Sequence, residues 1–335
     1  MSTDVQQLEH LASAVTSLRR QVAQRIVGQD DVVDGVLTAL LAGGHSLLIG
    51  VPGLAKTLLV STMAEALDLS FNRVQFTPDL MPGDITGTEL VEEDPATGKR
   101  AFRFVPGPVF ANVLLADEIN RTPPKTQAAL LQAMQEHQVT AAGKTYPLPD
   151  PFFVLATQNP IEQEGTYPLP EAQLDRFMLE LRVGYPSREE EEQVVERTTG
   201  SASASITPVL DSKAIHNLQQ LVRRIPVSKG LIRSAVTLAR MTRPGDGDSP
   251  AFIREYVEWG AGPRASQYLV LGAKARAAMD GRPMADLDDV KAVAPAVLRH
   301  RIVTNFSAEA AERSSESIVS ELIRTAAWNG GPGGR

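Results

Sequence analysis

The sequence contains no cysteine, and aromatic residues make up only 5% of it. The lack of cysteine excludes disulfides, thiolate zinc sites, iron–sulfur clusters and cysteine nucleophiles. The five histidines lie far apart along the chain, and no two of them have the spacing of paired zinc ligands. The composition therefore excludes thiol chemistry and argues against a metal site built from histidine.

The sequence also lacks a long hydrophobic run. Its most apolar stretch, residues 36–51, is interrupted by His45 and by three glycines, so it is too short and too broken to cross a bilayer. The N-terminal residues are polar and do not follow the basic and then apolar pattern of a signal peptide. We therefore expect a cytoplasmic protein without a membrane span.

Positive charge is not in excess either. Lys and Arg number 33 against 40 Asp and Glu, which gives a net charge of −7. This balance argues against a protein whose whole surface binds nucleic acid, although it does not exclude a local basic groove. The chain has 335 residues, of which 43% are hydrophobic, and this length suggests about two domains with a sizeable core.

Short apolar runs alternate with helical patterns in the first half of the chain. The runs predict buried strands at 45–50, 113–117, 152–157 and 178–183. Apolar residues at steps of three and four predict helices at 1–25, 30–41, 56–67 and 126–136. Strands that alternate with helices favour a parallel sheet covered on both faces. Segments 89–105 and 138–148 have the pattern of projecting hairpins, with turns at Asp94–Gly98 and Ala142–Gly143.

The character of the sequence changes at Tyr185. Ser187 and Glu190 fit a capping box, so we expect the acidic run from Glu189 to Glu192 to be the solvated first turn of a helix. Helical patterns follow at 211–224, 228–242, 264–280 and 287–300, with no strand signal of comparable strength. The sequence thus predicts a small all-helical second domain, and the glycine-rich residues 329–335 predict a mobile tail.

The strongest local motif is Gly50-Val-Pro-Gly-Leu-Ala-Lys56-Thr57, between a predicted strand and a predicted helix. A phosphate-binding loop needs inward-pointing backbone N–H groups, a helix N-terminus, a lysine and a hydroxyl for magnesium, and this segment supplies all of them. Ala55 stands where such loops usually have glycine, and its methyl group is tolerated if φ there is not positive. An ordinary Gly/Pro turn before a helix is the alternative.

Two carboxylates, Asp117 and Glu118, stand at the end of the apolar strand 113–117. A buried strand that ends this way is costly unless the carboxylates have a task at the carboxyl edge of the sheet. In that task Asp117 would hold magnesium through water, and Glu118 would polarise an attacking water. A strand ending in a polar turn is the alternative, but the position of the pair after the phosphate loop favours a functional role.

Three further polar residues are candidates for contacts with phosphate. Asn159 follows the strand 152–157, where it would orient the water or contact the terminal phosphate, although Asn before proline is also a common turn residue. Arg176, in Leu-Asp-Arg-Phe, and Arg264, after Gly-Ala-Gly-Pro, carry guanidinium groups suited to phosphoryl oxygens. For both arginines the alternative is an exposed side chain with no such role.

Together and in this order, the motifs resemble those of the AAA+ ATPases, and specifically of the MoxR family. The resemblance covers residues from about 20 to 305. Its carriers are Ile26-Val-Gly-Gln29 as the adenine-side box, GVPGLAKT as Walker A, LLADEINR as Walker B, ATQNP as sensor 1, LPEAQLDRF as the finger segment and GAGPRA as sensor 2. Alanine before the Walker A lysine is common in this family, so Ala55 supports the resemblance.

The resemblance implies an α/β fold: an AAA+ P-loop core with a parallel sheet, followed by a small all-helical lid domain. The implied limits are 1–25 for an N-terminal helix, 26–186 for the core with its hairpin inserts, 187–328 for the lid and 329–335 for the tail. It also implies ATP or ADP and Mg²⁺ bound between core and lid. A homo-oligomeric ring, usually a hexamer, is implied as well, with both hairpins facing its pore.

The resemblance also implies roles for single residues. Lys56 would bind the β and γ phosphates, and Thr57 and Asp117 would serve magnesium. Glu118 would activate water, and Asn159 would be the sensor. The implied nucleotide-binding residues are Val27, Gly28, Gly50, Pro52, Gly53, Leu54, Ala55, Lys56, Thr57, Leu58, Asp117 and Arg264.

Two arginines would complete the implied site. Arg264 would act on the nucleotide of its own subunit. Arg176 lies in the segment that donates an arginine to the neighbouring subunit, with Arg182 or Arg121 as alternatives for that task. Such a shared site predicts that an isolated subunit hydrolyses ATP slowly.

For function, the resemblance implies ATP-driven remodelling or chaperone activity that assists assembly, maturation or cofactor loading of client proteins. A protein with a von Willebrand factor A domain is an implied partner. A nucleic-acid translocase is the alternative, with phosphate contacts from three hairpin residues, Lys99, Arg100 and Arg103. Four acidic neighbours, Glu89, Glu92, Glu93 and Asp94, make that surface poorly electropositive, so we do not expect nucleic-acid binding. A nucleotide-dependent binding switch is a third possibility, ranked lower because both parts for hydrolysis are present.

Overall fold

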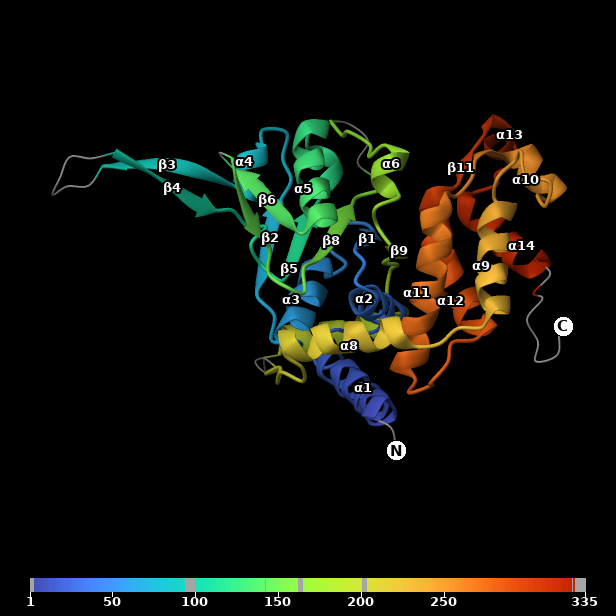
Figure 1. Cartoon of the computed structure of the whole chain (residues 1–335), viewed down its shortest axis with the longest axis horizontal. Coiled ribbons are helices and arrows are strands. Elements are labelled where there is room, and N and C mark those ends of the chain that lie inside the picture. Colours follow the sequence, from blue (N-terminus) through green and yellow to red (C-terminus); the bar gives the residue numbers. More distant parts are fainter. Residues whose placement is uncertain are drawn as a thin grey trace.

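The structure is a computed structural model, and it describes residues 3–93, 100–141, 143–161, 165–200, 204–326 and 328. The predicted turn at Asp94–Gly98, Lys99, Ala142 and the predicted tail 329–335 lie outside these residues. Elements are numbered in chain order, with short 3₁₀ helices written η (Figure 1).

A five-stranded parallel sheet in the order β2-β5-β8-β1-β9 forms the centre of the molecule (Figure 1). Its strands are β1 (Ser46–Ile49), β2 (Phe71–Gln75), β5 (Val113–Asp117), β8 (Phe153–Gln158) and β9 (Leu179–Arg182). Four of them follow the predicted apolar runs, as expected for strands buried on both faces. The strand β2 was not predicted, because Asn72, Arg73 and Gln75 interrupt its apolar residues.

Helices cover both faces of the sheet, as predicted. Successive strand residues point to opposite faces, so Leu48 and Leu115 join one buried cluster while Leu47 and Leu114 join another. The first cluster is shared with the helices α1 (Thr3–Val22), α2 (Asp30–Ala42) and α3 (Lys56–Ala66). The second is shared with α5 (Pro124–Glu136). Because all five strands are parallel, their carboxyl ends meet at one edge of the sheet.

Two hairpins project from this body, as the sequence predicted (Figure 1). They are β3 (Gly87–Glu93) with β4 (Arg100–Pro106), and β6 (Gln138–Ala141) with β7 (Lys144–Pro147). Phe104 stacks on Tyr146 with ring centroids 4.1 Å apart, which ties one hairpin to the other. Three short helices lie nearby: α4 (Pro82–Thr86), η1 (Ile119–Arg121) and α6 (Glu171–Leu174).

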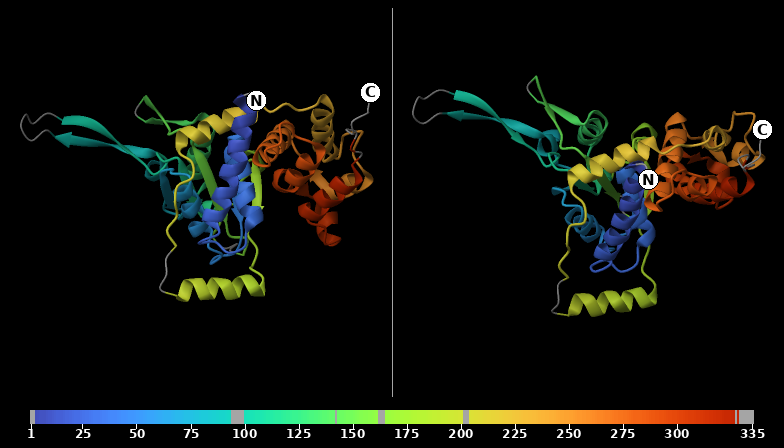
Figure 2. Two further views of the ribbon diagram at one scale, coloured as in Figure 1. Left: turned by 90° about the horizontal axis from the view of Figure 1, so that it is seen from below. Right: turned by 60° about the horizontal axis from the view of Figure 1, so that its bottom comes forward.

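The helix α7 (Arg188–Thr199) lies at the edge of the molecule (Figure 2), and Arg197 donates from it to the carbonyl oxygen of Ala23. It begins with the predicted capping box of Ser187 and Glu190. None of its residues is buried. Its position therefore does not come from a hydrophobic core of its own.

The C-terminal region is helical, as predicted, with one addition. Its helices are α8 (Ser212–Arg224), α9 (Lys229–Met241), α10 (Ala251–Tyr256), α11 (Pro263–Met279), α12 (Leu287–Leu298), η2 (Arg299–Arg301), α13 (Phe306–Ala310) and α14 (Ser315–Thr325). Two antiparallel strands, β10 (Val257–Trp259) and β11 (Val303–Thr304), were missed because they are too short to show an alternating pattern.

Both α8 and α11 pack on α1 and α2, so the C-terminal helices share one face of the core. Among the described helices, none combines the length and the apolar character that a bilayer crossing requires.

Candidate functional site

The predicted phosphate loop connects β1 to α3 at the carboxyl edge of the sheet. Gly53 and Ala55 both have positive φ, 84° and 53°, and α3 begins at Lys56 without a side-chain cap. The N-terminal N–H groups of α3 are therefore available to an anion. The condition under which a methyl group is easily tolerated at Ala55 is therefore not met, because the loop turns into the helix through the left-handed region.

Lys56 lies within this loop. Its ammonium group donates hydrogen bonds to the carbonyl oxygens of Gly50 and, at 3.1 Å, of Val51. Burial lowers the pKa of Lys56, while Asp117 and Glu118 act in the opposite direction. The ammonium group of Lys56 is thus bound to carbonyl oxygens of its own loop, and Thr57 follows it at the start of α3.

Asp117 is buried at the end of β5, and both of its carboxylate oxygens have partners. Thr157 of β8 donates to Oδ1 at 2.6 Å, and Arg73 of β2 donates to Oδ2 at 2.6 Å. Arg73 was not predicted, because β2 carries no clear strand pattern. The arginine neutralises a carboxylate that the sheet would otherwise hold buried and unpaired.

Glu118 turns away from the strand in the left-handed conformation, with φ 56°. Its backbone N–H donates to Thr157 Oγ1 at 2.8 Å, so one threonine holds both acidic residues. Its carboxylate accepts from Gln75 at 2.8 Å and from Arg121 at 2.9 Å. Tertiary structure thus adds Gln75 and Thr157 to the predicted pair.

Asn159 follows β8 directly and is buried. Its Oδ1 accepts a hydrogen bond from the backbone N–H of Ile161 at 3.2 Å. In the register of the sheet, Gln158 lies beside Ile49 of β1, which leads into the phosphate loop. The order of the strands therefore brings the predicted sensor to the same edge as the loop and the acidic pair.

The two predicted arginines take other positions. Arg176 donates to the carbonyl oxygen of Leu131 at 2.9 Å. Arg264, at the start of α11, forms an ion pair of 2.7 Å with Asp175. Asp175 also binds the buried Arg301 at 2.8 Å, so one carboxylate joins the core to two arginines of the C-terminal region. In this structure Arg264 is therefore engaged with Asp175.

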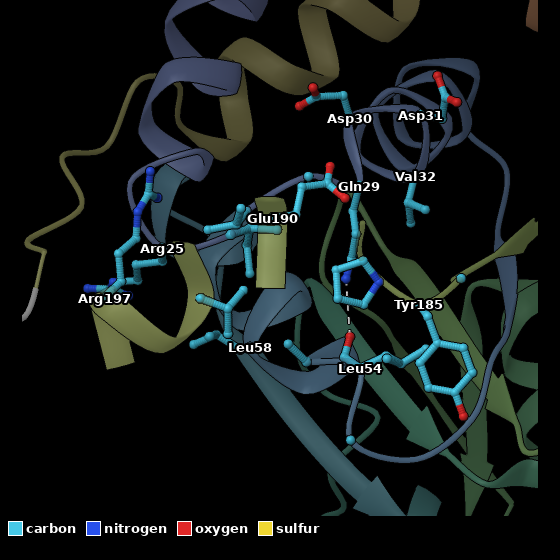
Figure 3. A pocket seen from close by; sticks show the side chains of 18 of the residues that line it. Arg25, Gln29, Asp30, Asp31, Val32, Leu54, Leu58, Tyr185, Glu190 and Arg197 are labelled. Atoms are coloured by element: carbon cyan, nitrogen blue, oxygen red, sulfur yellow. Dashed lines mark hydrogen bonds between the residues drawn. The ribbon is translucent and has the colours of Figure 1, made fainter. Parts of the chain in front are cut away.

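A cavity of about 540 Å³ lies next to the phosphate loop (Figure 3). Predicted residues in its lining are Val27, Gly28, Gly53, Leu54, Ala55 and Leu58. Other residues in its lining are Arg25, Ile26, Gln29, Asp30, Asp31, Val32, Arg182, Gly184, Tyr185, Pro186, Glu190, Val194, Arg197 and Thr198. Gln29 fixes one wall by donating to the carbonyl oxygen of Leu54 at 3.3 Å.

The cavity differs from its predicted composition in two ways. Among the described residues, its lining does not include Gly50, Pro52, Lys56, Thr57, Asp117 or Arg264. It does include Glu190 and other residues of α7. The acidic run forms the first turn of α7, as predicted, and Glu190 in addition lines the cavity. The capping box was visible in the sequence, but the approach of the helix to Gly28 was not.

The residues at the sheet edge suit a magnesium ion. Mg²⁺ prefers oxygen ligands and usually combines one or two carboxylates with waters and substrate phosphates. Thr57 and Asp117 supply a hydroxyl and a carboxylate next to a phosphate loop. Within the described residues, no group of three or more His, Cys, Asp or Glu side chains is arranged to hold a metal alone.

Comparisons with known proteins give a consistent result. The family described as "ATPase family associated with various cellular activities (AAA)" matches residues 45–179, and the AAA lid domain matches residues 251–322. Chaperone MoxR1 of Mycobacterium tuberculosis is 44% identical over 322 residues, which cover 95% of this chain and 84% of that protein.

Two further relatives cover nearly the whole chain. Protein MoxR of Methylorubrum extorquens is 32% identical over 334 residues, 93% of each chain. The crystal structure of a protein described as an ATPase, from Cytophaga hutchinsonii, has a TM-score of 0.88 and is 39% identical, covering 96% of this chain and 97% of that chain.

Proposed function

The chain belongs to the MoxR family of AAA+ ATPases, and from this premise we propose that it couples Mg²⁺-dependent ATP hydrolysis in a ring of subunits to the remodelling of client proteins. One observation carries the proposal. The phosphate loop, the acidic pair Asp117 and Glu118, and Asn159 meet at one edge of a parallel sheet, beside a cavity of about 540 Å³.

In the proposed mechanism, the loop and Lys56 bind the phosphates, and the cavity holds the nucleoside. Thr57 and Asp117 would hold Mg²⁺, which when bound neutralises phosphate charge. Glu118 accepts a proton from the attacking water, and the hydrogen bonds that Gln75 and Arg121 donate to Oε2 fix the direction of its carboxylate. Catalysis of this kind depends mostly on position and on charge stabilisation.

A site shared between subunits is supported by the contacts of Arg121 and Arg182, the two alternatives to Arg176 as the arginine donated to a neighbour. Arg121 contacts Glu118 of the same chain, and Arg182 lines the cavity of the same chain. Arg176 makes neither contact among those described, so we propose that it reaches the nucleotide of a neighbouring subunit. A trans arginine of this kind contributes roughly 10³–10⁵ in rate. A hexameric ring is the closed assembly that we propose.

The role of Arg264 stays a prediction. Its guanidinium is paired with Asp175 at 2.7 Å, so it can bind a phosphate only after that ion pair opens. The family resemblance further supports the proposal that the protein acts on client proteins and binds a partner with a von Willebrand factor A domain.

The translocase alternative has weaker support. Arg103 on the projecting hairpin is paired with Glu92 at 2.9 Å, which lowers its availability to nucleic-acid phosphates. Lys99 lies outside the described residues. Salt-sensitive stimulation of the ATPase by DNA would favour this alternative over client remodelling.

The test is the variant Glu118→Gln. Without the general base, steady-state ATPase should fall at least about a hundredfold, while calorimetric ATP binding with Mg²⁺ is retained. Glu136→Gln, an exposed change at the end of α5, is the matched control and should leave turnover unchanged. Unchanged turnover in Glu118→Gln would remove Glu118 from the mechanism. The trapped variant also provides the bait for isolating client proteins from the native cell.

A further inference from the structure

The helix α7 forms one wall of the cavity although it has no hydrophobic core of its own. Glu190, Val194, Arg197 and Thr198 line the cavity from this helix (Figure 3). Near its other end, Arg197 donates to the carbonyl oxygen of Ala23 at 2.7 Å. The side of α7 that faces the body thus carries polar and small apolar side chains, and they border the space that we assign to a nucleoside.

Glu190 is held so that one carboxylate oxygen is used and the other is available. Oε2 accepts from the backbone N–H of Ser187 at 2.8 Å, which closes the capping box. Oε1 is directed at Gly28 on the opposite wall, where a Cβ atom would collide with it and would lie 2.7 Å from Cδ. Within the described part of the chain, Oε1 has no hydrogen-bond donor.

The arginines that line the cavity are engaged elsewhere, and Arg182 pairs with Glu180 at 3.3 Å and with Glu316. The guanidinium of Arg25 binds Glu65 and, at 2.9 Å, the carbonyl oxygen of Ala204. Arg197 is bound to Ala23. Within the described residues, Oε1 of Glu190 therefore keeps no protein donor.

A carboxylate only accepts hydrogen bonds. Adenine carries an exocyclic amino group, which donates, whereas guanine and hypoxanthine carry a carbonyl oxygen at the same position, which accepts. We propose that Glu190 makes the cavity selective for adenine nucleotides by accepting a hydrogen bond from this amino group. The proposal rests on the proposed function, because it assigns the cavity to the nucleoside. The proposal also explains why position 28 is a glycine, since a side chain there would displace the carboxylate of Glu190.

The test compares the binding of ATP, inosine triphosphate and 2′-deoxyATP to the full chain by calorimetry. Wild type should prefer ATP to inosine triphosphate by roughly ten- to a hundredfold, because the carbonyl analogue leaves the carboxylate unpaired. Glu190→Gln keeps an acceptor for Ser187, as Gln also fits a capping box, and adds an N–H donor for the carbonyl. Its preference should fall to within about threefold.

A matched control and a second variant sharpen this test. Glu191→Gln removes the same charge from the same turn, but Glu191 is absent from the lining, so its preference should equal that of wild type. Glu190→Asp keeps the charge and withdraws the carboxylate by one methylene, so it should also lose preference. Thermal unfolding of each variant shows whether it remains folded.

Three results have distinct meanings. An unchanged preference in folded Glu190→Gln and Glu190→Asp overturns the proposal. A variant that changes discrimination against 2′-deoxyATP and not against inosine triphosphate also overturns it, since Glu190 would then contact the sugar. If wild type binds none of the three nucleotides, the proposed function fails, and that failure is distinguishable from the loss of base selectivity alone.

Discussion

The two ends of the candidate site are built in different ways. At the phosphate end, Asp117 and Asn159 lie at the ends of strands that are buried on both faces, and Thr157 connects Asp117 to Glu118. At the nucleoside end, as we propose it, α7 contributes a wall without a single buried residue. The groups that we propose for the chemistry are thus held by a packed sheet, whereas the groups that we propose to contact the base are held by a helix with few anchors.

This difference has a physical cause. Positioning a reacting group within a fraction of an ångström requires neighbours that cannot move, and a close-packed sheet supplies them. A surface wall that admits and releases a nucleotide must open at low cost, and segments with few buried apolar contacts open most easily.

The largest expected effect separates the two regions by stability. Leu115→Ala removes a fully buried side chain of β5 and should lower the free energy of unfolding by about 3 to 5 kcal/mol, from lost transfer energy and the cavity left behind. Val194→Ala on α7 should change it by less than about 0.5 kcal/mol. Urea unfolding of both variants checks this pair. Equal losses would show that α7 is packed as firmly as the sheet.

The second-largest expected effect is a loss of stability in acid, which arises at His45 in the sheet region. His45 precedes β1, where Nδ1 accepts from the backbone N–H of Val154 at 3.1 Å and Nε2 lies 3.1 Å from the carbonyl oxygen of Met134. Burial, the largest cause, lowers the pKa of His45 from 6.5 to about 4. Protonation therefore favours the unfolded chain. The stabilisation is complete above pH 6.5 and is lost as the pH falls toward 4, by up to about 3 kcal/mol.

The measurement is the free energy of unfolding from pH 7.5 to 4. The variant His45→Gln offers one amide donor and one carbonyl acceptor and does not titrate, so its decline should be smaller by about the same 3 kcal/mol. His10→Gln changes an exposed residue of α1 and serves as the control. Parallel pH profiles for wild type and His45→Gln would contradict the prediction.

The smallest expected effect lies where the two regions meet. Ala55 has φ 53°, a conformation that costs a residue with a Cβ roughly 1–2 kcal/mol and that glycine adopts freely. Part of that gain is offset by the greater freedom of glycine in the unfolded chain, so Ala55→Gly should stabilise the protein by about 0.5 to 1 kcal/mol. Ala64→Gly inside α3 should instead destabilise it by about 1 kcal/mol. The urea concentration at the midpoint of unfolding should rise for Ala55→Gly and fall for Ala64→Gly, and a fall for both would contradict the prediction.

Sequence patterns predicted the phosphate end more completely than the nucleoside end. The loop, the acidic pair and Asn159 each follow a continuous apolar strand, so a local pattern was sufficient to find them. Arg73 and Gln75 stayed hidden because three polar residues break the apolar pattern of β2, which owes its place to pairing with β5, where Gln75 lies opposite Asp117. Their contacts join residues more than 40 positions apart in the chain.

The nucleoside end required the tertiary structure for a similar reason. The capping box of Ser187 and Glu190 was predicted from four neighbouring residues, but its approach to Gly28 depends on how the chain returns from β9 past the body. The ion pair of Arg264 with Asp175 likewise joins a C-terminal helix to the core. A local motif contains no information on such a pairing.

The sequence by itself determined the parallel sheet, the phosphate loop and the residue types at the sheet edge, because periodicity and strand-end chemistry are local properties of the chain. Only the tertiary structure decided which groups face each other across the site. Arg73 meets Asp117, Gln75 meets Glu118 and Glu190 meets Gly28 through packing between segments distant in the chain, and the geometry of such contacts depends on every element between them.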